Sequence, residues 1–210
     1  GEIMSKKEKL IQLIHEENQA KATLFALDML ENKDVDVIDL FQNILTDALH
    51  RIDCKELDKE CIWREHIKTS IVRTIIEVSY PYVLRKLDSV EKNNKKVLIV
   101  CPSEEYHEIG ARMAHTFFTL QGYESVFIGA NTPLNVILDS VKYLKPDYLA
   151  ISVTNFYNVI KAKETVEAIK LFNPNIKIIA GGQAFDIDSA LETVQADYHI
   201  STFDSIKDIK

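Results

Sequence analysis

Glycine and proline are distributed very unevenly along this 210-residue chain, and this unevenness strongly constrains its fold. Between Ile3 and Val100 there is no glycine, and Pro81 is the only proline. From Cys101 onward the chain contains five glycines and four prolines. Long stretches without these residues favour helices, whereas regularly spaced breakers favour short elements joined by turns. The sequence therefore predicts a helical first half and a second half of alternating elements.

In the first half, apolar residues recur at the three- and four-residue spacing of amphipathic helices. Asp36 suits the N-cap of the third helix, and the fourth is expected to end near Pro81. The four predicted apolar stripes are Leu10, Leu13 and Ile14; Ala20, Leu24, Leu27 and Leu30; Phe41, Ile44, Leu45, Ala48 and Ile52; and Ile67, Ile71, Thr74, Ile75 and Val78. These stripes predict a four-helix bundle over residues 4–87. The polar run at residues 88–95 is predicted to be a linker.

The second half, residues 96–210, alternates short apolar runs with helical patterns. The predicted strands are Lys96–Val100, Ser125–Ile128, Tyr148–Ser152, Lys177–Ala180 and Tyr198–Ile200, and the predicted helices are Ile109–Leu120, Leu134–Leu144, Val159–Phe172 and Ser189–Gln195. This alternation is typical of an α/β fold with a doubly wound, flavodoxin-like (Rossmann-like) parallel sheet of five strands. Ligands of such sheets bind beyond the carboxyl ends of the strands, here after Val100, Ile151 and Ala180.

Charge and composition exclude several classes of protein. The net charge of −7 argues against binding to a nucleic-acid backbone. No apolar run approaches the roughly 18–20 residues that cross a bilayer, and the polar start lacks the apolar segment of a signal peptide. Cys54, Cys61 and Cys101 are too few and too scattered for a disulfide framework, and Cys54, Cys61 and His66 match no common zinc spacing. We therefore expect buried free cysteines and a cytoplasmic protein.

The segment after the first predicted strand carries a histidine at the mouth of the sheet. His107 follows Glu105 by two residues and precedes Gly110 by three. A neutral imidazole is a good ligand for transition metals, and a carboxylate on its other nitrogen selects the tautomer and raises its basicity. We expect Glu105 to fill that role and Gly110 to let the helix start pack closely. Taken alone, this spacing is more typical of a solvated surface histidine than of a metal ligand.

Three segments at successive strand ends together resemble the cobalamin-binding domains. Those domains carry an Asp-x-His-x-x-Gly signature, a Ser-x-Leu or Ser-x-Thr element and a Gly-Gly pair. The matching residues here are Glu105-Tyr106-His107-Glu108-Ile109-Gly110, Ser152-Val153-Thr154 and Gly181-Gly182. The resemblance covers about 90 residues in the order of the family's strands. Glutamate stands at position 105 where the family usually has aspartate, which adds one methylene between the backbone and the carboxylate.

The resemblance implies a bound cobalamin (a cobalt corrinoid) with His107 as the lower cobalt ligand, in place of the cofactor's own base. It implies that Tyr106, Glu108 and Ile109 belong to the binding loop with Glu105 and Gly110. It also implies that the freed nucleotide tail passes Ser152, Thr154, Gly181 and Gly182. Read singly, the glycines would indicate an ordinary turn and Ser152 a capping hydroxyl.

The helical half resembles the cap that the family places over the cofactor's upper face. Glu65-His66 is similar to a segment of the light-sensing, cobalamin-dependent regulators, so Trp63, Glu65 and His66 are candidate cofactor contacts. Core packing of Trp63 and a surface ion pair of Glu65 and His66 are the alternatives. Lys55 stands where those regulators have tryptophan, and their DNA-binding segment has no counterpart in these 210 residues.

Three functions remain open from the sequence. The first is a cobalamin-dependent sensor or regulator that acts through a protein partner or as a homo-oligomer. The second is a corrinoid methyl carrier of a methyltransferase system, and the third is a flavodoxin-like module with another ligand. The chain offers no general acid–base pair or nucleophile of the usual kinds, which disfavours catalysis without a partner.

Overall fold

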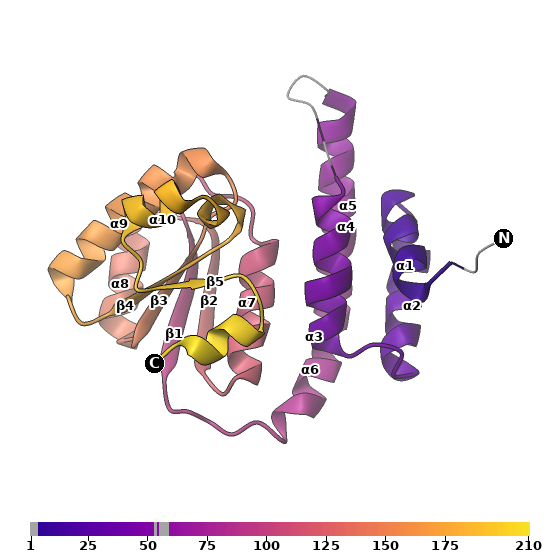
Figure 1. Ribbon diagram of the computed structural model, residues 1–210, viewed down its shortest axis with the longest axis horizontal. Helices are drawn as coiled ribbons and strands as arrows, with labels where there is room; N and C mark the ends of the chain where they lie inside the picture. The colour runs from indigo at the N-terminus through magenta and orange to yellow at the C-terminus, as the bar shows by residue number, and fades with distance from the viewer. Residues whose placement is uncertain (1–3, 53, 55–58) are drawn as a thin grey trace. The chain divides into compact units, whose positions relative to one another are not determined.

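The computed structural model describes residues 4–52, 54 and 59–210, which form two compact units separated between Asp88 and Ser89 (Figure 1). The helical unit contains α1 (Lys6–His15), α2 (Gln19–Glu31), a continuous helical run of α3 (Val37–Asp39), η1 (Leu40–Leu45) and α4 (Thr46–His50), then α5 (Lys59–Val78) and α6 (Tyr80–Leu87). The segment η1 is a π-helical stretch inside that run. Asp36 caps the run as predicted, because its side chain accepts a hydrogen bond from the backbone N–H of Asp39 at 2.9 Å.

The fourth predicted helix is followed in the structure by a further helix that the sequence did not predict. Helix α5 ends at Val78, close to where the sequence predicts, and α6 follows after Ser79. Pro81 lies in the first turn of α6, where a residue needs no N–H for the helix and its restricted φ is already helical. The proline was therefore predicted correctly as an end, but its second role as a helix start was missed.

The prediction for the buried face of α2 is confirmed for Leu30 and wrong for Ala20 and Leu24. Ala20 and Leu24 are exposed, Leu24 by 63%, whereas Ala22, Ala26, Met29 and Leu30 are buried. Both stripes have helical spacing, so the period alone does not select one. The small alanines allow close approach of α1 and α5, the two helices that pack on α2.

The prediction that Cys54 and Cys61 are free is also wrong. The two residues form a disulfide, and their Cα atoms are 5.4 Å apart. A separation of seven residues brings the start of α5 back to Cys54 within the usual span of such a bond. Unpaired cysteines therefore no longer support the prediction of a cytoplasmic location.

The sheet unit, described throughout residues 89–210, confirms the predicted fold class. Its strands are β1 (Lys96–Pro102), β2 (Glu124–Thr132), β3 (Tyr148–Ser152), β4 (Lys177–Gly181) and β5 (Tyr198–Ile200). They lie in the order β2-β1-β3-β4-β5, and every pair is parallel. The intervening helices are α7 (Ile109–Leu120), α8 (Leu134–Leu144), α9 (Val159–Phe172) and α10 (Asp188–Val194). Strand β2 runs four residues beyond its predicted end, through a register shift against β1.

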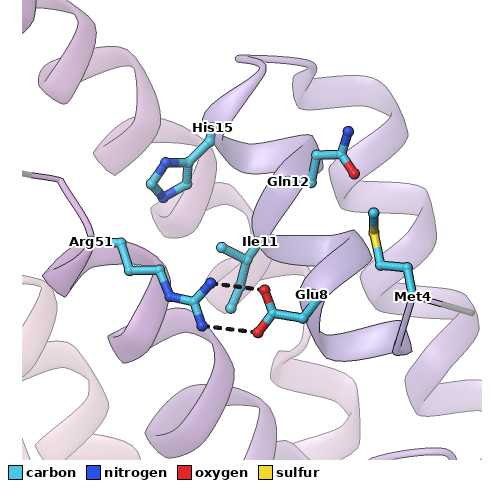
Figure 2. Close-up of a pocket in the computed structure, with 6 residues that line it drawn as sticks. All are labelled: Met4, Glu8, Ile11, Gln12, His15 and Arg51. Carbon is cyan, nitrogen blue, oxygen red and sulfur yellow. Dashed lines mark hydrogen bonds and ion pairs between the residues drawn. The ribbon is translucent and has the colours of Figure 1, made fainter. Parts of the chain in front are cut away.

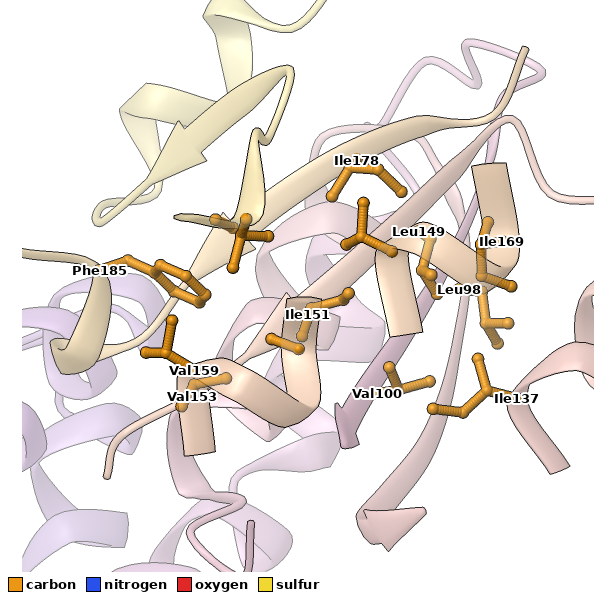
Figure 3. Packing of buried hydrophobic residues seen from close by; sticks show 14 of the residues in the cluster. Leu98, Val100, Ile137, Leu149, Ile151, Val153, Val159, Ile169, Ile178 and Phe185 are labelled. Carbon is orange, nitrogen blue, oxygen red and sulfur yellow. The ribbon is translucent and has the colours of Figure 1, made fainter. Parts of the chain in front are cut away.

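Two layers of helices cover this sheet (Figure 1). On one face, Leu98, Val100, Leu149, Ile151 and Ile178 pack with apolar residues of α8, α9 and α10 in the main core (Figure 3). Because strand side chains alternate, the other residues of β1 face the opposite side, which α7 covers. The parallel strands are therefore buried on both faces, and their carboxyl ends meet at one rim. No helix among the described residues is long and apolar enough to cross a membrane.

Candidate cofactor site

The site lies at the carboxyl ends of β1 and β3, and its central residue is a buried carboxylate. Glu105, on the loop after β1, is 0% exposed. Its Oε1 accepts hydrogen bonds from the backbone N–H of His107 at 2.9 Å and from His107 Nδ1 at 2.6 Å. The predicted contact between these two residues is therefore present, with the longer glutamate side chain in place of aspartate.

The other oxygen of Glu105 is held by the segment after β3. Oε2 accepts from the backbone N–H groups of Thr154 at 3.1 Å and Asn155 at 3.0 Å, and from Asn158 Nδ2 at 3.2 Å. Two loops that are about 50 residues apart in sequence thus meet on one carboxylate. A buried charge is tolerable where its lone pairs are all taken by donors in this way.

The hydrogen bonds also determine the charge of the site. Burial raises the pKa of Glu105, but the hydrogen bonds from His107, Asn155 and Asn158 outweigh burial and bring the pKa down to about 2. The carboxylate is therefore ionised at neutral pH and acts only as an acceptor. It holds the proton of the imidazole on Nδ1, and Nε2 is then the nitrogen with the lone pair for a metal. The side chain of His107 is 55% exposed, so it is open to a ligand as large as a cofactor.

The backbone of the loop is held in an uncommon conformation by the end of β2. Glu104 and Asn131 both have positive φ, 70° and 48°. The N–H of Glu104 donates to Asn131 Oδ1 at 2.8 Å, and the N–H of Asn131 donates to the carbonyl oxygen of Glu105 at 2.7 Å. The extension of β2 therefore supports the loop that carries His107.

The paired glycines lie where neighbouring segments come close to the backbone, Val153 beside Gly182 and Ile200 beside Gly181. Gly182 has φ 96° and ψ 160°, a region that is essentially restricted to glycine. A Cβ atom there would lie 2.3 Å from the carbonyl oxygen of Val153. Gly181 pairs with Ser152 across β3 and β4, and a Cβ atom there would meet Ile200 at 3.4 Å. Gly182 is thus required by the fold itself, independently of any ligand.

Gly110 has a different role from the one predicted. It lies in the first turn of α7, it is exposed, and a Cβ atom there would meet nothing within 4 Å. Close helix packing therefore does not explain this glycine. Its open surface lies three residues from His107, where a flat ligand would need room.

The remaining predicted loop and strand-end residues divide into exposed and buried groups. Tyr106 is exposed, whereas Ile109 is buried in the domain. Glu108 accepts a hydrogen bond from Arg112 Nε at 3.0 Å on the first turns of α7. Ser152 is buried at the end of β3.

The donor set suits a metal that arrives already bound in a macrocycle. Within residues 4–52, 54 and 59–210, no group of three histidine, cysteine or acidic side chains is arranged to hold a metal ion. Cys101 lies beneath the loop, and burial, followed by the charges of Glu105 and Glu108, raises the pKa of its thiol to about 12. His107 thus offers one ring nitrogen whose partner nitrogen is bonded to Glu105, and a metal whose other positions are filled by a ring needs no more than one such donor.

A family model for the B12 binding domain matches residues 95–203, just over half of the chain. The chain belongs to the B12-binding domain family. The matched residues include the loop of Glu105 and His107, the end of β3 and the paired glycines, so the resemblance seen in the sequence is confirmed at the level of the family. Cobalamin is therefore the cofactor of this protein. The third function considered above, a flavodoxin-like module with another ligand, is excluded by its ligand and not by its fold.

Solved structures of corrinoid proteins share the fold over nearly the whole chain. The monomethylamine corrinoid protein of Methanosarcina barkeri is similar with a TM-score of 0.78 at 18% identity, over 95% of this chain and 94% of that chain. A cobalamin-binding protein of Desulfitobacterium hafniense DCB-2 has a TM-score of 0.51 at 16% identity, over 96% and 94%. The methanol:cobalamin methyltransferase complex MtaBC of M. barkeri has 0.50 at 19%, over 94% and 75%. At these identities the likeness establishes the fold.

The three predicted cap contacts of this B12-binding protein lie in the helical unit. Trp63, Glu65 and His66 are all on the first half of α5. Trp63 is 52% exposed, and the guanidinium of Arg64 lies 5.8 Å from its ring centroid. Core packing of Trp63 is thereby excluded within the helical unit. Contact of these three residues with cobalamin stays a prediction.

A pocket in the helical unit is a weaker candidate for ligand binding. It has a volume of about 310 Å³ and is lined by Met4, Glu8, Ile11, Gln12, His15 and Arg51 (Figure 2). Both carboxylate oxygens of Glu8 pair with Arg51, at 2.8 and 2.9 Å, and Arg51 also bonds Asp47. The charges that line this pocket therefore already satisfy one another.

Sequence reasoning missed three asparagines that build the B12 site. Asn131, Asn155 and Asn158 hold the loop or the carboxylate, and Asn158 is buried. The signal for two of them was present. Asn155 and Asn158 stand just before a predicted helix and just after a predicted strand end, where a polar residue both caps the helix and faces the ligand rim.

Asn158→Ala is expected to lower the free energy of unfolding of the domain by about 1–2 kcal/mol. The amide donates to the carbonyl of Glu104 at 3.1 Å and to Glu105 Oε2 at 3.2 Å, and alanine leaves both acceptors short of a partner. Urea unfolding of the apo-protein measures the change. Asn135→Ala, at an exposed position on α8, is the matched control and should change stability by less than about 0.5 kcal/mol. Equal effects in the two variants would contradict the assigned role.

Proposed function

We propose that this protein binds cobalamin with His107 Nε2 as the lower cobalt ligand, and that it serves as a corrinoid methyl carrier for a methyltransferase partner. The observation that carries the proposal is the 2.6 Å contact between His107 Nδ1 and Glu105 at the rim of the sheet. This contact holds the imidazole proton on Nδ1, so that Nε2 is the nitrogen that carries the lone pair. The pair is prepared in advance, since the loop after β3 and the end of β2 hold the carboxylate and its backbone.

The chain's own residues supply the binding surface in this proposal. Ser152 offers a hydroxyl to the polar groups of the cofactor's tail, and Gly181 and Gly182 let that tail lie against backbone. Gly110 leaves space beside the macrocycle. Bound cobalamin would supply a cobalt atom able to accept and release a methyl group, and the protein would hold and orient it.

A carrier is better supported than a sensor. The similar structures include a monomethylamine corrinoid protein and a methanol:cobalamin methyltransferase complex. The sensor reading rests on sequence resemblance in three segments, Glu65-His66, His107–Met113 and Asn131-Thr132-Pro133. Against it, Lys55 stands where those regulators have tryptophan. The proposed partner is thus a methyltransferase subunit, and the net charge of −7 gives no support to nucleic acid.

Electron paramagnetic resonance of the Co(II) form tests the proposed ligand directly. One axial ¹⁴N nucleus splits each cobalt line into a triplet, and an axial ¹⁵N nucleus splits it into a doublet. Protein grown with ¹⁵N-histidine and loaded with ordinary cobalamin is therefore expected to give doublets. Triplets would mean that the cofactor's own base remains on the cobalt and would refute the histidine assignment.

His107→Ala provides the second arm of the test. Because His107 is more than half exposed, the variant should fold normally and lose retained cobalamin absorbance after desalting. Wild-type protein loaded with methyl-cobalamin, and kept in darkness or in light, then distinguishes the carrier from the sensor. Methyl exchange with a partner methyltransferase, insensitive to light, supports the carrier, and a light-dependent change of oligomeric state supports the sensor instead.

A further inference from the structure

The disulfide between Cys54 and Cys61 lies at the start of α5, a helix whose two halves are anchored very differently. The buried side chains of α5 are Ile71, Val72, Ile75 and Ile76, all in its second half. From Lys59 to Ser70 every side chain is half-buried or exposed. Helices in proteins owe most of their stability to the packing of an apolar face. The first half of α5 therefore depends on a few local contacts.

Two ion pairs of Arg64 hold this half of the helix. Its Nε lies 2.6 Å from Glu17 Oε1, and its Nη1 lies 3.1 Å from Glu60 Oε1. The pair with Glu60 is exposed, with side-chain exposures of 43% and 68%, and contributes little to stability. The pair with Glu17, whose side chain is 17% exposed, is the stronger of the two. The disulfide adds a covalent tie between this half of the helix and the chain that precedes it.

Two features favour thiol exchange at the disulfide between Cys54 and Cys61. Both cysteines are half-buried and lie outside the cores. Cys61 is the third residue of α5, and thiolates in the first turn of a helix are stabilised by its N–H groups. A stabilised thiolate is a good leaving group in disulfide exchange. Cys101 differs in both respects, since it is fully buried and burial raises its pKa to about 12.

We propose that Cys54 and Cys61 form a reversible dithiol–disulfide pair that controls the order of the first half of α5. A thiolate of a dithiol reductant attacks Cys54 Sγ, the S–S bond breaks, and Cys61 leaves as a thiolate. The reductant's second thiol then displaces Cys54 from the mixed disulfide. Two electrons and two protons pass to the pair, and the reductant becomes a disulfide. The pair acts in the helical unit, whether or not the sheet unit carries a cofactor.

Hydrogen exchange of the full chain, with and without dithiothreitol, tests the proposal. On reduction, the amides of residues 62–70 are expected to exchange at least about tenfold faster, because local unfolding becomes easier where packing is weak. The amides of residues 71–78, which carry the buried side chains, should change by less than about twofold. Trp63, the only tryptophan, gives a second readout, since its fluorescence anisotropy should fall on reduction.

The double variant Cys54→Ser/Cys61→Ser is the matched control. It should show the fast exchange of the reduced chain and no response to dithiothreitol. Alkylation under native conditions, followed by mass spectrometry, should label Cys54 and Cys61 only after reduction and leave Cys101 unlabelled in both states. The proposal is overturned if oxidised glutathione fails to form the bond, if dithiothreitol fails to open it without denaturant, or if exchange at residues 62–70 is the same in both states.

Discussion

Gly182→Ala is expected to destabilise the sheet unit by about 4 kcal/mol, a large part of the stability of a domain of this size. Two costs combine at this position. The backbone at φ 96° and ψ 160° is essentially restricted to glycine, and strain there costs about 1–3 kcal/mol. The added Cβ would also lie 2.3 Å from the carbonyl oxygen of Val153, so the strand ends must separate at about 1–3 kcal/mol more. Urea unfolding of the apo-protein, followed by circular dichroism, measures the loss.

Gly110→Ala is the matched comparison, because the two glycines border the same site. A Cβ atom at Gly110 would meet nothing within 4 Å, and alanine is the better residue in a helix by up to about 1 kcal/mol. The apo-protein should therefore be unchanged or slightly stabilised. Cobalamin retention should fall if this surface faces the macrocycle, as we propose. A stable, well-folded Gly182→Ala variant would refute the backbone argument, whatever its affinity for cobalamin.

Glu105→Gln is expected to destabilise the apo-protein by about 3 kcal/mol at pH 7 and to flatten its acid dependence. A carboxamide has the size of the carboxylate, but its NH₂ group must face N–H donors either from His107 or from the segment after β3. The pKa of Glu105 is about 2 in the folded protein, below its ordinary value of 4.5. A difference of this size corresponds to about 3 kcal/mol.

The direction of the pH effect follows from the lowered pKa. The stabilisation is fully present above about pH 4.5, where the unfolded chain also carries the ionised group, and it is lost as the pH falls toward 2. Unfolding free energies measured from pH 6 to pH 2.5, in steps, should therefore fall more steeply in the wild type than in Glu105→Gln. Glu104→Gln, the exposed neighbour, is the control and should keep the wild-type slope. Parallel curves for wild type and Glu105→Gln would contradict the assignment.

Much of the sheet unit could be predicted from the sequence, because the spacing of its glycines and prolines and the periodicity of its apolar residues indicate the same elements. Helices α7, α8 and α9 and strands β3 and β5 have the predicted bounds. Short apolar runs between glycines and prolines leave few alternatives for such elements. The helical unit was harder, since breakers are absent there. The errors in the buried face of α2 and the missed helix α6 have the same cause. Apolar periodicity was the only signal there, and no glycine or proline spacing supplemented it.

Some residues of the B12 site could likewise be identified from the sequence, and others could not. Glu105, His107, Ser152 and the paired glycines stand at the ends of predicted strands, and the resemblance to cobalamin-binding domains is what singles them out. Asn155 and Asn158 stand where the sequence predicts capping residues, but the contacts of the asparagines with the site are not predictable, because those contacts cross the rim. Asn158 donates to a carboxylate 53 residues away, and Asn131 holds a loop 27 residues away. Such contacts depend on strand order and on the extra length of β2, which local sequence does not specify.

The sequence by itself therefore determined the class of fold and the positions of most strands and helices of the sheet unit. Local propensity and breaker spacing are sufficient for these, since they act within a few residues of chain. Only the tertiary structure decided which glycine is required by the backbone, which side chains hold Glu105 and that Cys54 and Cys61 are joined. Each of these depends on atoms brought within a few ångströms of one another by the packing of whole elements, and steric exclusion and hydrogen bonding act only at that range.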